Sequence, residues 1–163
     1  MSAIGPLRIR EAVRALVIDT DDRVLLVRFD FPDRSVWAPP GGGIDPGEAP
    51  HDALRRELGE EIGLDDPDIG PHLWNRLHVF AFLNGMFDGQ RDQTYLVRVP
   101  AGFEPRPMFT WAQLNAEYVF DMRWWTLTEL RAADIVTAPI QLASLLEDVL
   151  INGAPDEPLS VEA

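Results

Sequence analysis

Apolar residues in the first part of the chain follow patterns typical of β-strands. Residues 10–18 are rich in Val, Ala, Ile and Leu, and residues 24–27 form a second apolar run. The acidic segment 19–22 between them predicts two strands joined by a short turn. Residues 29–34 are turn-prone, and the prolines and glycines of residues 38–43 argue against a helix or an interior strand there.

A helical spacing replaces this pattern in residues 50–62. Leu54, Leu58 and Ile62 recur every four residues, which places them on one face of an α-helix. Gly63 follows directly, and glycine commonly ends a helix because it adopts a left-handed conformation without strain. This is the best-defined helix that the pattern predicts.

Strands and helices alternate in the rest of the chain. Residues 73–83 and 94–99 predict strands, with Asn-Gly and Asp-Gly turn signals at 84–85 and 88–89 between them. Residues 101–118 contain prolines and aromatic residues and predict no regular element. Long loops of this kind are often functional.

The C-terminal part predicts one more strand and two helices. Residues 122–127 predict the strand, and Thr128 is placed to cap a short helix that ends at Ala133. Residues 139–150 predict an amphipathic helix begun by proline. Residues 153–163 predict a flexible tail.

Composition is that of an ordinary globular protein. Of the 163 residues, 46% are hydrophobic and 25% are charged, and this length fits one domain, which we assign to residues 1–152. No apolar stretch has the length of a signal peptide core or a membrane span. The sequence therefore predicts a cytoplasmic protein with no membrane partner.

Charge and residue types restrict the ligands. A net charge of −13 argues against a duplex nucleic acid as partner, because such binding needs clustered basic residues. There is no cysteine, so a metal ion would have to bind oxygen or imidazole. An acidic protein that binds anionic phosphates needs metal cations between its own carboxylates and the phosphates. The acidic composition is therefore consistent with a metal-dependent activity on phosphates.

Three carboxylates gather on the helix predicted for residues 50–62. Glu57, Glu60 and Glu61 are spaced i, i+3 and i+4, so they project from neighbouring positions and repel one another. Glu61 borders the apolar stripe, where partial burial favours a raised pKa or a nearby cation. A hard divalent ion, Mg²⁺ above all, would relieve the repulsion. The alternative is a solvated face on which Asp52, Arg56 and Glu60 form surface ion pairs.

Residues 42–64 closely resemble the Nudix box. The family pattern is G, five residues, E, seven residues, RE, an aliphatic residue, any residue, EE, any residue, G and an aliphatic residue. The chain matches it without departure at Gly42, Glu48, Arg56, Glu57, Leu58, Glu60, Glu61, Gly63 and Leu64. The resemblance implies a fold of the α/β (α+β) class, an α/β/α sandwich with a mixed β-sheet between helices.

The resemblance also implies a divalent metal site for Mg²⁺, with Mn²⁺ as a substitute. The implied ligands are the three box glutamates, assisted by an upstream glutamate and a glycine carbonyl, namely Glu57, Glu60, Glu61, Glu48 and Gly42 or Gly43. Arg56 would orient a box carboxylate through a salt bridge. Glycines at positions 41–43 would allow the backbone to approach substrate closely, although each could equally serve a plain turn.

The implied reaction is attack of water on phosphorus. Metal ions offset charge on the phosphates and lower the pKa of the attacking water, and a carboxylate removes its proton. Glu61 is the candidate base within the box, whereas many relatives use a glutamate in a distal loop. Glu117 is the residue that matches that description, with Asp121 and Glu104 behind it. The alternative for each is a solvated loop acid.

Four residues outside the box are candidates for binding substrate. Arg28 could reach phosphates, or could be an ordinary surface residue. Trp37, Phe109 and Trp111 could stack on a base, against the alternative of core packing. The three histidines lack metal-ligand spacing and indicate structural or surface roles: His51, His72 and His78.

Together these patterns predict a Mg²⁺-dependent hydrolase that cleaves the pyrophosphate bond of a nucleoside diphosphate linked to another moiety. The substrate classes are a nucleoside triphosphate or its oxidised form, ADP-ribose or a dinucleoside polyphosphate, and no subfamily signature selects among them. The alternative is a non-catalytic nucleotide-binding sensor on the same fold. The expected partner is a small-molecule nucleotide, and the expected state is a monomer or a homodimer.

Overall fold

A computed structural model describes residues 6–79 and 85–162. In chain order its elements are β1 (Ile9–Ile18), β2 (Val24–Phe31), β3 (Arg34–Ala38), β4 (Gly41–Gly43), α1 (Pro50–Ile62), β5 (His72–Val79), β6 (Gly89–Arg98), α2 (Trp111–Ala116), β7 (Val119–Trp125), α3 (Leu127–Ala132), α4 (Leu142–Asn152) and β8 (Leu159–Val161).

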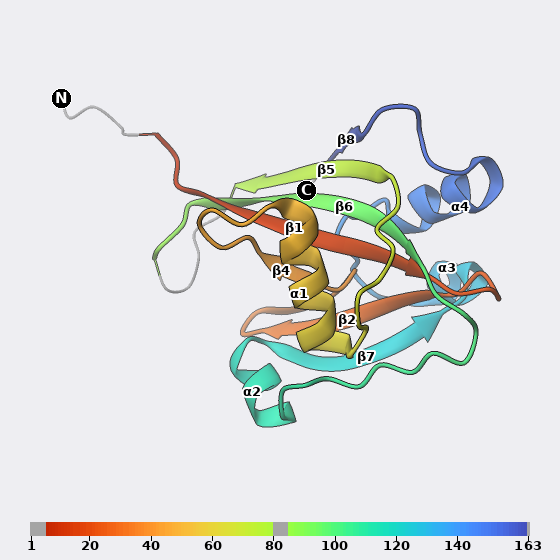
Figure 1. Cartoon of the computed structure of the whole chain (residues 1–163), viewed down its shortest axis with the longest axis horizontal. Coiled ribbons are helices and arrows are strands. Elements are labelled where there is room, and N and C mark those ends of the chain that lie inside the picture. Colours follow the sequence, from red (N-terminus) through yellow and green to blue (C-terminus); the bar gives the residue numbers. More distant parts are fainter. Residues whose placement is uncertain (1–5, 80–84, 163) are drawn as a thin grey trace.

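The strands form one mixed sheet (Figure 1), in the order β3-β2-β1-β6-β5-β8, with β4 beside β1 and β7 beside β2. The central pair β1 and β6 is parallel over its whole length, and β5 and β8 are also parallel. The other named pairs are antiparallel. The sheet therefore brings residues about 80 positions apart in sequence into direct register.

Strands β1 and β2 part soon after the turn that joins them. Their register holds at Ile18 and Val24, and further along β1 the neighbour is β4, which pairs with residues 12–14. Strand β2 pairs instead with β3 and β7. The sheet thus splits, and β4 lies at the split.

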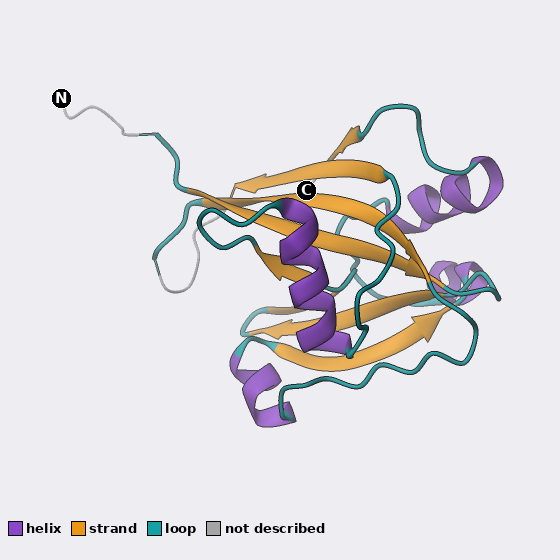
Figure 2. Ribbon diagram, viewed as in Figure 1, coloured by secondary structure: helices purple, strands orange, loops and turns teal. Residues whose placement is uncertain are grey.

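Helices cover both faces of the sheet (Figure 2). Because side chains alternate along a strand, Val13 and Val17 of β1 face α1, where they pack with Leu54, whereas Leu16 faces α3 and α4 and packs with Leu146. The predicted fold class, a mixed sheet between helices, is confirmed. Among the described residues, no helix combines the length and the apolar character needed to cross a bilayer.

Helix α1 has the bounds that the sequence predicts. Pro50 occupies the first turn, and Gly63 ends the helix in the left-handed region with φ 69°, its N–H donating to carbonyls of the last turn. The apolar stripe of Leu54, Leu58 and Ile62 is fully buried. Local signals therefore suffice to define this helix.

Two predictions in the N-terminal part need correction. Residues 29–34 are mostly strand, because β2 continues to Phe31 and β3 starts at Arg34, and β3 and β7 provide backbone hydrogen bonds on both sides of β2. The glycines of residues 41–43 form the short strand β4, which pairs with β1. A three-residue strand of this kind tolerates glycine.

Three further corrections concern the C-terminal part. Thr126, not Thr128, caps α3, because its side chain and Glu129 form a reciprocal capping box. Helix α4 begins at Leu142, and Pro139 lies in the preceding loop. The tail predicted for residues 153–163 contains β8, which pairs with β5.

The remaining predictions in the middle of the chain have mixed outcomes. The segment 101–118, without a predicted element, contains α2 with a capping box at Thr110. Strand β5 is described as far as Val79. The end of the strand predicted for residues 73–83, and Asn84 of the turn signal, lie outside the described residues.

Candidate active site

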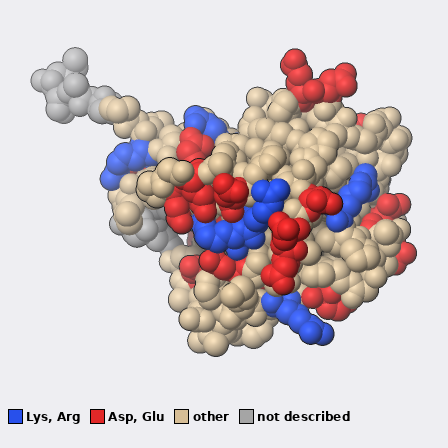
Figure 3. All heavy atoms as spheres, in the orientation of Figure 1, with Lys and Arg blue, Asp and Glu red and all other residues tan. Residues whose placement is uncertain are grey.

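The acidic face of α1 lies against β4, where the sheet splits. The carboxylate of Glu57 is so close to the Gly42 backbone that a β-carbon on Gly42 would lie 2.4 Å from Cδ of Glu57. Figure 3 shows acidic and basic side chains crowded together on the face of the molecule that carries α1. Glycine at position 42 is therefore needed to admit this carboxylate.

Arg56 organises the acids around it. Its guanidinium donates two hydrogen bonds to Glu48, of 2.9 and 2.8 Å, one to Glu57 of 2.9 Å, and one to the Gly43 carbonyl of 3.1 Å. Glu60 approaches the same group at 3.6 Å. The bonds to Arg56 lower the pKa of Glu48 to about 2, and a backbone N–H of the preceding turn contributes. Arg56 thus ties the loop before α1 to the helix.

Glu61 is the most buried acid of the cluster, with 7% of its surface exposed. Its Oε1 atom has no hydrogen-bond partner among the described residues. Burial raises the pKa of Glu61 to about 8. The positive charge of Arg14 opposes this rise, whereas the negative charge of Glu57 adds to it. Burial also raises the pKa of Glu57, although the hydrogen bond from Arg56 opposes this.

The donor set of this cluster fits a divalent cation. Within the described part of the chain, no three acidic or histidine side chains already converge as a ready ligand set. However, a buried carboxylate oxygen without a partner is costly unless a cation or a donor satisfies it. The clustered oxygen ligands of Glu57, Glu60 and Glu61 are those that Mg²⁺ prefers. Arg56 bonds Glu57 and lies 3.6 Å from Glu60, so it offsets part of the negative charge of the cluster.

The raised pKa of Glu61 predicts how stability depends on pH without metal. Below the ordinary value of 4.5, both the folded and the unfolded chain are protonated, whereas between 4.5 and about 8 only the unfolded chain releases the proton. Stability is therefore lost as the pH rises through this window. With a chelator present, we expect the melting temperature to fall by roughly 5–10 °C between pH 5 and pH 8.

Thermal unfolding of Glu61→Gln is the control for this expectation. Glutamine does not titrate, so most of the pH dependence between pH 5 and pH 8 should disappear in this variant. An identical pH dependence in both proteins would show that the Glu61 carboxyl is not the group responsible.

Glu117 lies near the box although it follows α2. Its negative charge raises the pKa of both Glu57 and Glu61 and favours the charged form of Arg10. The side chain is exposed. The next residue, Tyr118, has a left-handed backbone with φ 68°, and its carbonyl accepts a 2.9 Å hydrogen bond from the N–H of Asp30. The turn that carries Glu117 is therefore fixed to β2.

The candidates for binding substrate differ in how far other parts of the protein already engage them. Arg28 pairs with Asp30 at 3.0 Å and reaches Asp121 at 3.6 Å. Trp37 is only 8% exposed and packs edge-on against Trp125, so we assign it to the core rather than to substrate. Phe109 is half-buried and packs against a small core cluster, and Trp111 is 48% exposed.

A group of polar residues on the sheet was missed at the sequence level. Arg10 and Arg14 of β1, Gln90 and Asp92 of β6 and Arg76 of β5 share the face opposite to α1 and are joined by hydrogen bonds and ion pairs. Alternation in the sequence was the available signal, because Arg10 and Arg14 share one side of the strand with the apolar residues Ala12, Leu16 and Ile18.

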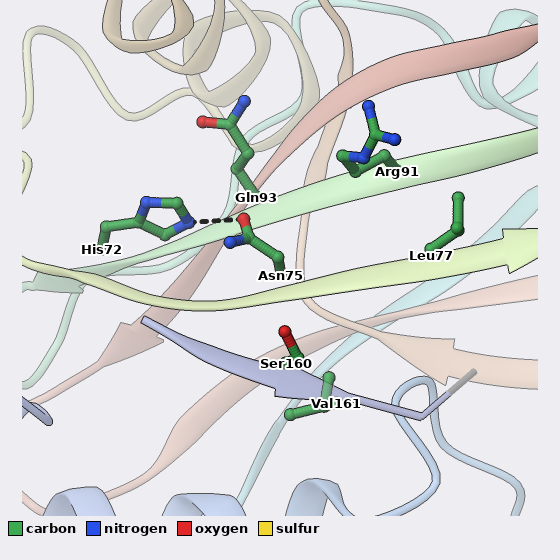
Figure 4. Close-up of a pocket in the computed structure, with 7 residues that line it drawn as sticks. All are labelled: His72, Asn75, Leu77, Arg91, Gln93, Ser160 and Val161. Atoms are coloured by element: carbon green, nitrogen blue, oxygen red, sulfur yellow. Dashed lines mark hydrogen bonds between the residues drawn. The ribbon is translucent and has the colours of Figure 1, made fainter. Parts of the chain in front are cut away.

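Hollows in the surface of the described residues include two that bear on the site. One, of about 450 Å³, is lined by Arg10, Gly43 and Glu57 among others, and so adjoins the acidic cluster. The other, of about 560 Å³, is lined by β5, β6 and β8 (Figure 4), where His72 bonds Asn75 and lies near Gln93. None of the residues of the candidate site lines the second hollow.

Comparisons with known proteins agree with this arrangement. A family model described as the NUDIX domain matches residues 8–146. The RNA pyrophosphohydrolase of Rickettsia peacockii (strain Rustic) is 34% identical over 129 residues, which cover 74% of this chain and 77% of that protein. A crystal structure of a MutT NUDIX hydrolase from Burkholderia pseudomallei aligns with a TM-score of 0.63 and 27% identity, covering 87% of this chain and 98% of that one.

A further solved structure supports the fold alone. The NUDIX domain of Shewanella oneidensis NrtR, solved in complex with ADP ribose, aligns with a TM-score of 0.64 at 21% identity. That alignment covers 87% of this chain and 88% of that one.

Proposed function

Because this chain belongs to the NUDIX domain family and is a pyrophosphohydrolase, we propose that it cleaves the pyrophosphate bond of a nucleoside diphosphate joined to another group, with Mg²⁺ as the cation and Mn²⁺ as a substitute. The observation that carries this proposal is the buried Oε1 atom of Glu61, without a partner in the described residues and beside Glu57. A bound cation explains such an atom better than a purely structural role of this helix face does.

Glu57, Glu60 and Glu61 would hold the cation, with Glu48 and the backbone at Gly42 and Gly43 close by. A divalent cation here would offset charge on the phosphate oxygens and lower the pKa of the attacking water. Arg56 keeps Glu48 and Glu57 in place through its hydrogen bonds. The solvated ion-pair face is disfavoured, because the shortest bonds of Arg56 go to Glu48 and Glu57, whereas its contact with Glu60 is 3.6 Å and Asp52 lies near Arg55 instead.

We assign the general base to Glu117, with Glu61 as the second candidate. Glu117 is ionisable, exposed and close enough to Glu57 and Glu61 to affect their pKa values. The left-handed backbone at Tyr118 costs free energy, and strain of this kind is often found where a neighbouring side chain must be aimed. The carboxylate would accept the proton of water as that water attacks phosphorus.

Substitution of Glu117 by Gln is expected to lower kcat by about 10²-fold or more with little change in KM, because general-base catalysis typically contributes that much. Steady-state kinetics of the wild type and the variant with Mg²⁺ would measure it. Glu104→Gln is the matched control, since Glu104 is another exposed acid of the 101–118 segment. Equal losses in the two variants would exclude the assignment.

Two aromatic residues stay candidates for contact with a base. Trp111 is the more exposed, at 48%, and lies in the first turn of α2, six residues before Glu117. Phe109 precedes the cap of the same helix. Arg28 is a weaker candidate for phosphate, because Asp30 and Asp121 already engage it.

A substrate panel tests the proposed function. The purified protein with Mg²⁺ would be incubated with a nucleoside triphosphate, its oxidised form, ADP-ribose and a dinucleoside polyphosphate. The Rickettsia relatives are named RNA pyrophosphohydrolases, so RNA with a 5′-triphosphate joins the panel. Turnover of one class supports the proposal. Tight binding without turnover of any compound would instead support the alternative of a nucleotide-binding sensor.

A further inference from the structure

The second hollow lies on the sheet face that also carries α1, and its walls come from the three neighbouring strands β5, β6 and β8 (Figure 4). Most of the residues that line it are polar: His72, Asn75, Arg91, Gln93 and Ser160. Its volume of about 560 Å³ is within the range of small-molecule sites. A sheet face can also expose polar side chains simply to water, so the arrangement of these side chains is decisive.

Two amide side chains of this hollow have fixed orientations. Asn75 and Gln93 are direct neighbours across β5 and β6. The Oδ1 atom of Asn75 lies 2.8 Å from Nε2 of His72, and Oε1 of Gln93 accepts a 2.7 Å hydrogen bond from the Tyr95 hydroxyl. Within the described residues, neither amide nitrogen donates a hydrogen bond to another side chain or to the backbone. Each nitrogen therefore keeps its N–H donors for a ligand.

The rings that orient the two amides are themselves packed. His72 stacks on Tyr95 with ring centroids 4.7 Å apart, and Tyr95 meets His51 of α1 edge-on at 5.0 Å. Tyr95 is only 7% exposed. The amide donors are thus preorganised, which reduces the entropy lost when a ligand binds. A face that only contacts water has no need of such positioning.

The charge of the lining favours an uncharged ligand. Arg91 forms an ion pair with Glu11 of the neighbouring strand β1, so its positive charge is already offset. The amides and the Ser160 hydroxyl carry no charge, and Figure 3 shows few charged side chains over β5. The net charge of −13 opposes the binding of a further anion. A phosphate group would therefore gain little here.

We propose that this hollow is a second ligand site, which binds the base of a nucleoside whose purine carries a carbonyl group, as in inosine and guanosine. Two amide donors need two acceptors, and O6 and N7 of such a purine lie side by side, whereas adenine has an amino donor in place of O6. Leu77, which lines the hollow and is 46% exposed, offers an apolar contact to the flat base. The inference goes beyond the proposed function and does not depend on hydrolysis.

Titration with inosine and adenosine tests the site, because the bases of these two nucleosides differ at this carbonyl group. NMR spectra of the full chain with inosine are expected to show backbone amide shifts in β5, β6 and β8, and none in residues 42–64. Inosine should bind about tenfold more tightly than adenosine, the difference that one hydrogen bond makes. Ribose alone should cause no shifts, because it lacks the base.

Asn75→Asp removes the amide donor while the shape of the side chain is kept. The new carboxylate can still accept from His72, but it presents an oxygen to the ligand where the N–H was. This variant should bind inosine about tenfold more weakly than the wild type. Asn152→Asp is the matched control, since it makes the same change at an exposed position of α4, the helix that covers the opposite face. It should bind inosine as the wild type does.

Gln93→Glu replaces Asn75→Asp, with the same expectation, if thermal unfolding shows that Asn75→Asp does not fold. The proposal would be overturned by the absence of shifts with inosine, by shifts confined to residues 42–64, or by equal affinities for inosine and adenosine. Unchanged inosine affinity in the folded variant would also overturn it. Binding of ribose as tight as that of inosine would show a sugar site instead.

Kinetic measurements separate two sources of the base, a free nucleoside and a second nucleoside of the substrate. Glu11 lines the hollow beside Glu57 and its partner Arg91 lines the second hollow, so the two hollows adjoin. If the base belongs to a substrate, inosine should raise KM for a dinucleoside polyphosphate with guanine bases but not for the matching nucleoside triphosphate. If the ligand is a free nucleoside, both KM values should stay unchanged while inosine binds.

These measurements also distinguish the second site from the proposed function. If no compound is hydrolysed but inosine binding still depends on Asn75, the proposed function fails and the second site is retained. Hydrolysis by a protein that does not bind inosine has the reverse meaning.

Discussion

Substitution of Glu61 by Gln is expected to lower kcat/KM for the best substrate by about 10³-fold or more. Under the proposed function this substitution removes a metal ligand, and several kcal/mol of transition-state stabilisation correspond to a rate factor of that size. The fold should be retained, because glutamine has nearly the same shape. Near pH 8 the metal-free variant should even be more stable than the wild type, since it no longer buries a carboxylate at position 61. Steady-state kinetics with Mg²⁺ and thermal unfolding would measure the two effects.

Asp52→Asn is the control for Glu61→Gln. Asp52 is an acid in the first turn of the same helix, and its side chain is 71% exposed. Its removal changes the net charge by the same amount and should leave activity within about twofold. Full activity in Glu61→Gln would rule out the metal-ligand role, whereas a loss in both variants would point to net charge instead.

The second large effect is expected for Gly42→Ala. Its new β-carbon would lie 2.4 to 2.6 Å from the carboxylate atoms of Glu57. That carboxylate is the end of a flexible side chain, so it can move away while the backbone stays in place. We expect kcat to fall by about 10²-fold, because an error of about 1 Å in position can cost that much. The free energy of unfolding should change by less than about 1 kcal/mol.

Two other glycines provide comparisons for Gly42→Ala. A β-carbon on Gly59, within α1, would meet nothing closer than 3.9 Å, so Gly59→Ala should keep activity and gain about 0.5–1 kcal/mol of stability. A β-carbon on Gly41 would lie 2.0 Å from the Val13 carbonyl oxygen, so Gly41→Ala should destabilise the fold itself. Denaturant unfolding of the three variants, together with their kcat, distinguishes a displaced carboxylate from a damaged sheet. Wild-type activity in Gly42→Ala would contradict the placement of Glu57.

Local chemistry explains which parts of the fold could be predicted from the sequence. Helix α1 could be predicted to the residue, because Pro50, the apolar stripe and Gly63 all act within one short segment. The start of α3 was misplaced by two residues, although the Thr126 and Glu129 pair is itself a local capping signal. Strand β8 could not be predicted, because its partner β5 lies some 85 residues earlier.

The same distinction holds for the candidate site. The box glutamates and Arg56 lie on one helix and its preceding loop, so their spacing predicts their proximity. The polar group formed by Arg10 and Arg14 with Gln90 and Asp92 depends on the parallel pairing of β1 with β6, which no local pattern specifies. Glu117 is an intermediate case. The resemblance pointed to a distal glutamate, whereas the left-handed backbone at Tyr118 that fixes this turn is visible only in the structure.

Strand β8 connects the C-terminal residues to the chemistry of the sheet. It pairs with β5 at Trp74, Asn75 and Arg76, and the last of these contacts Asp92 of β6. A protease that trimmed residues 153–163 would therefore expose the edge of β5 at that position and loosen the backbone beneath Arg76.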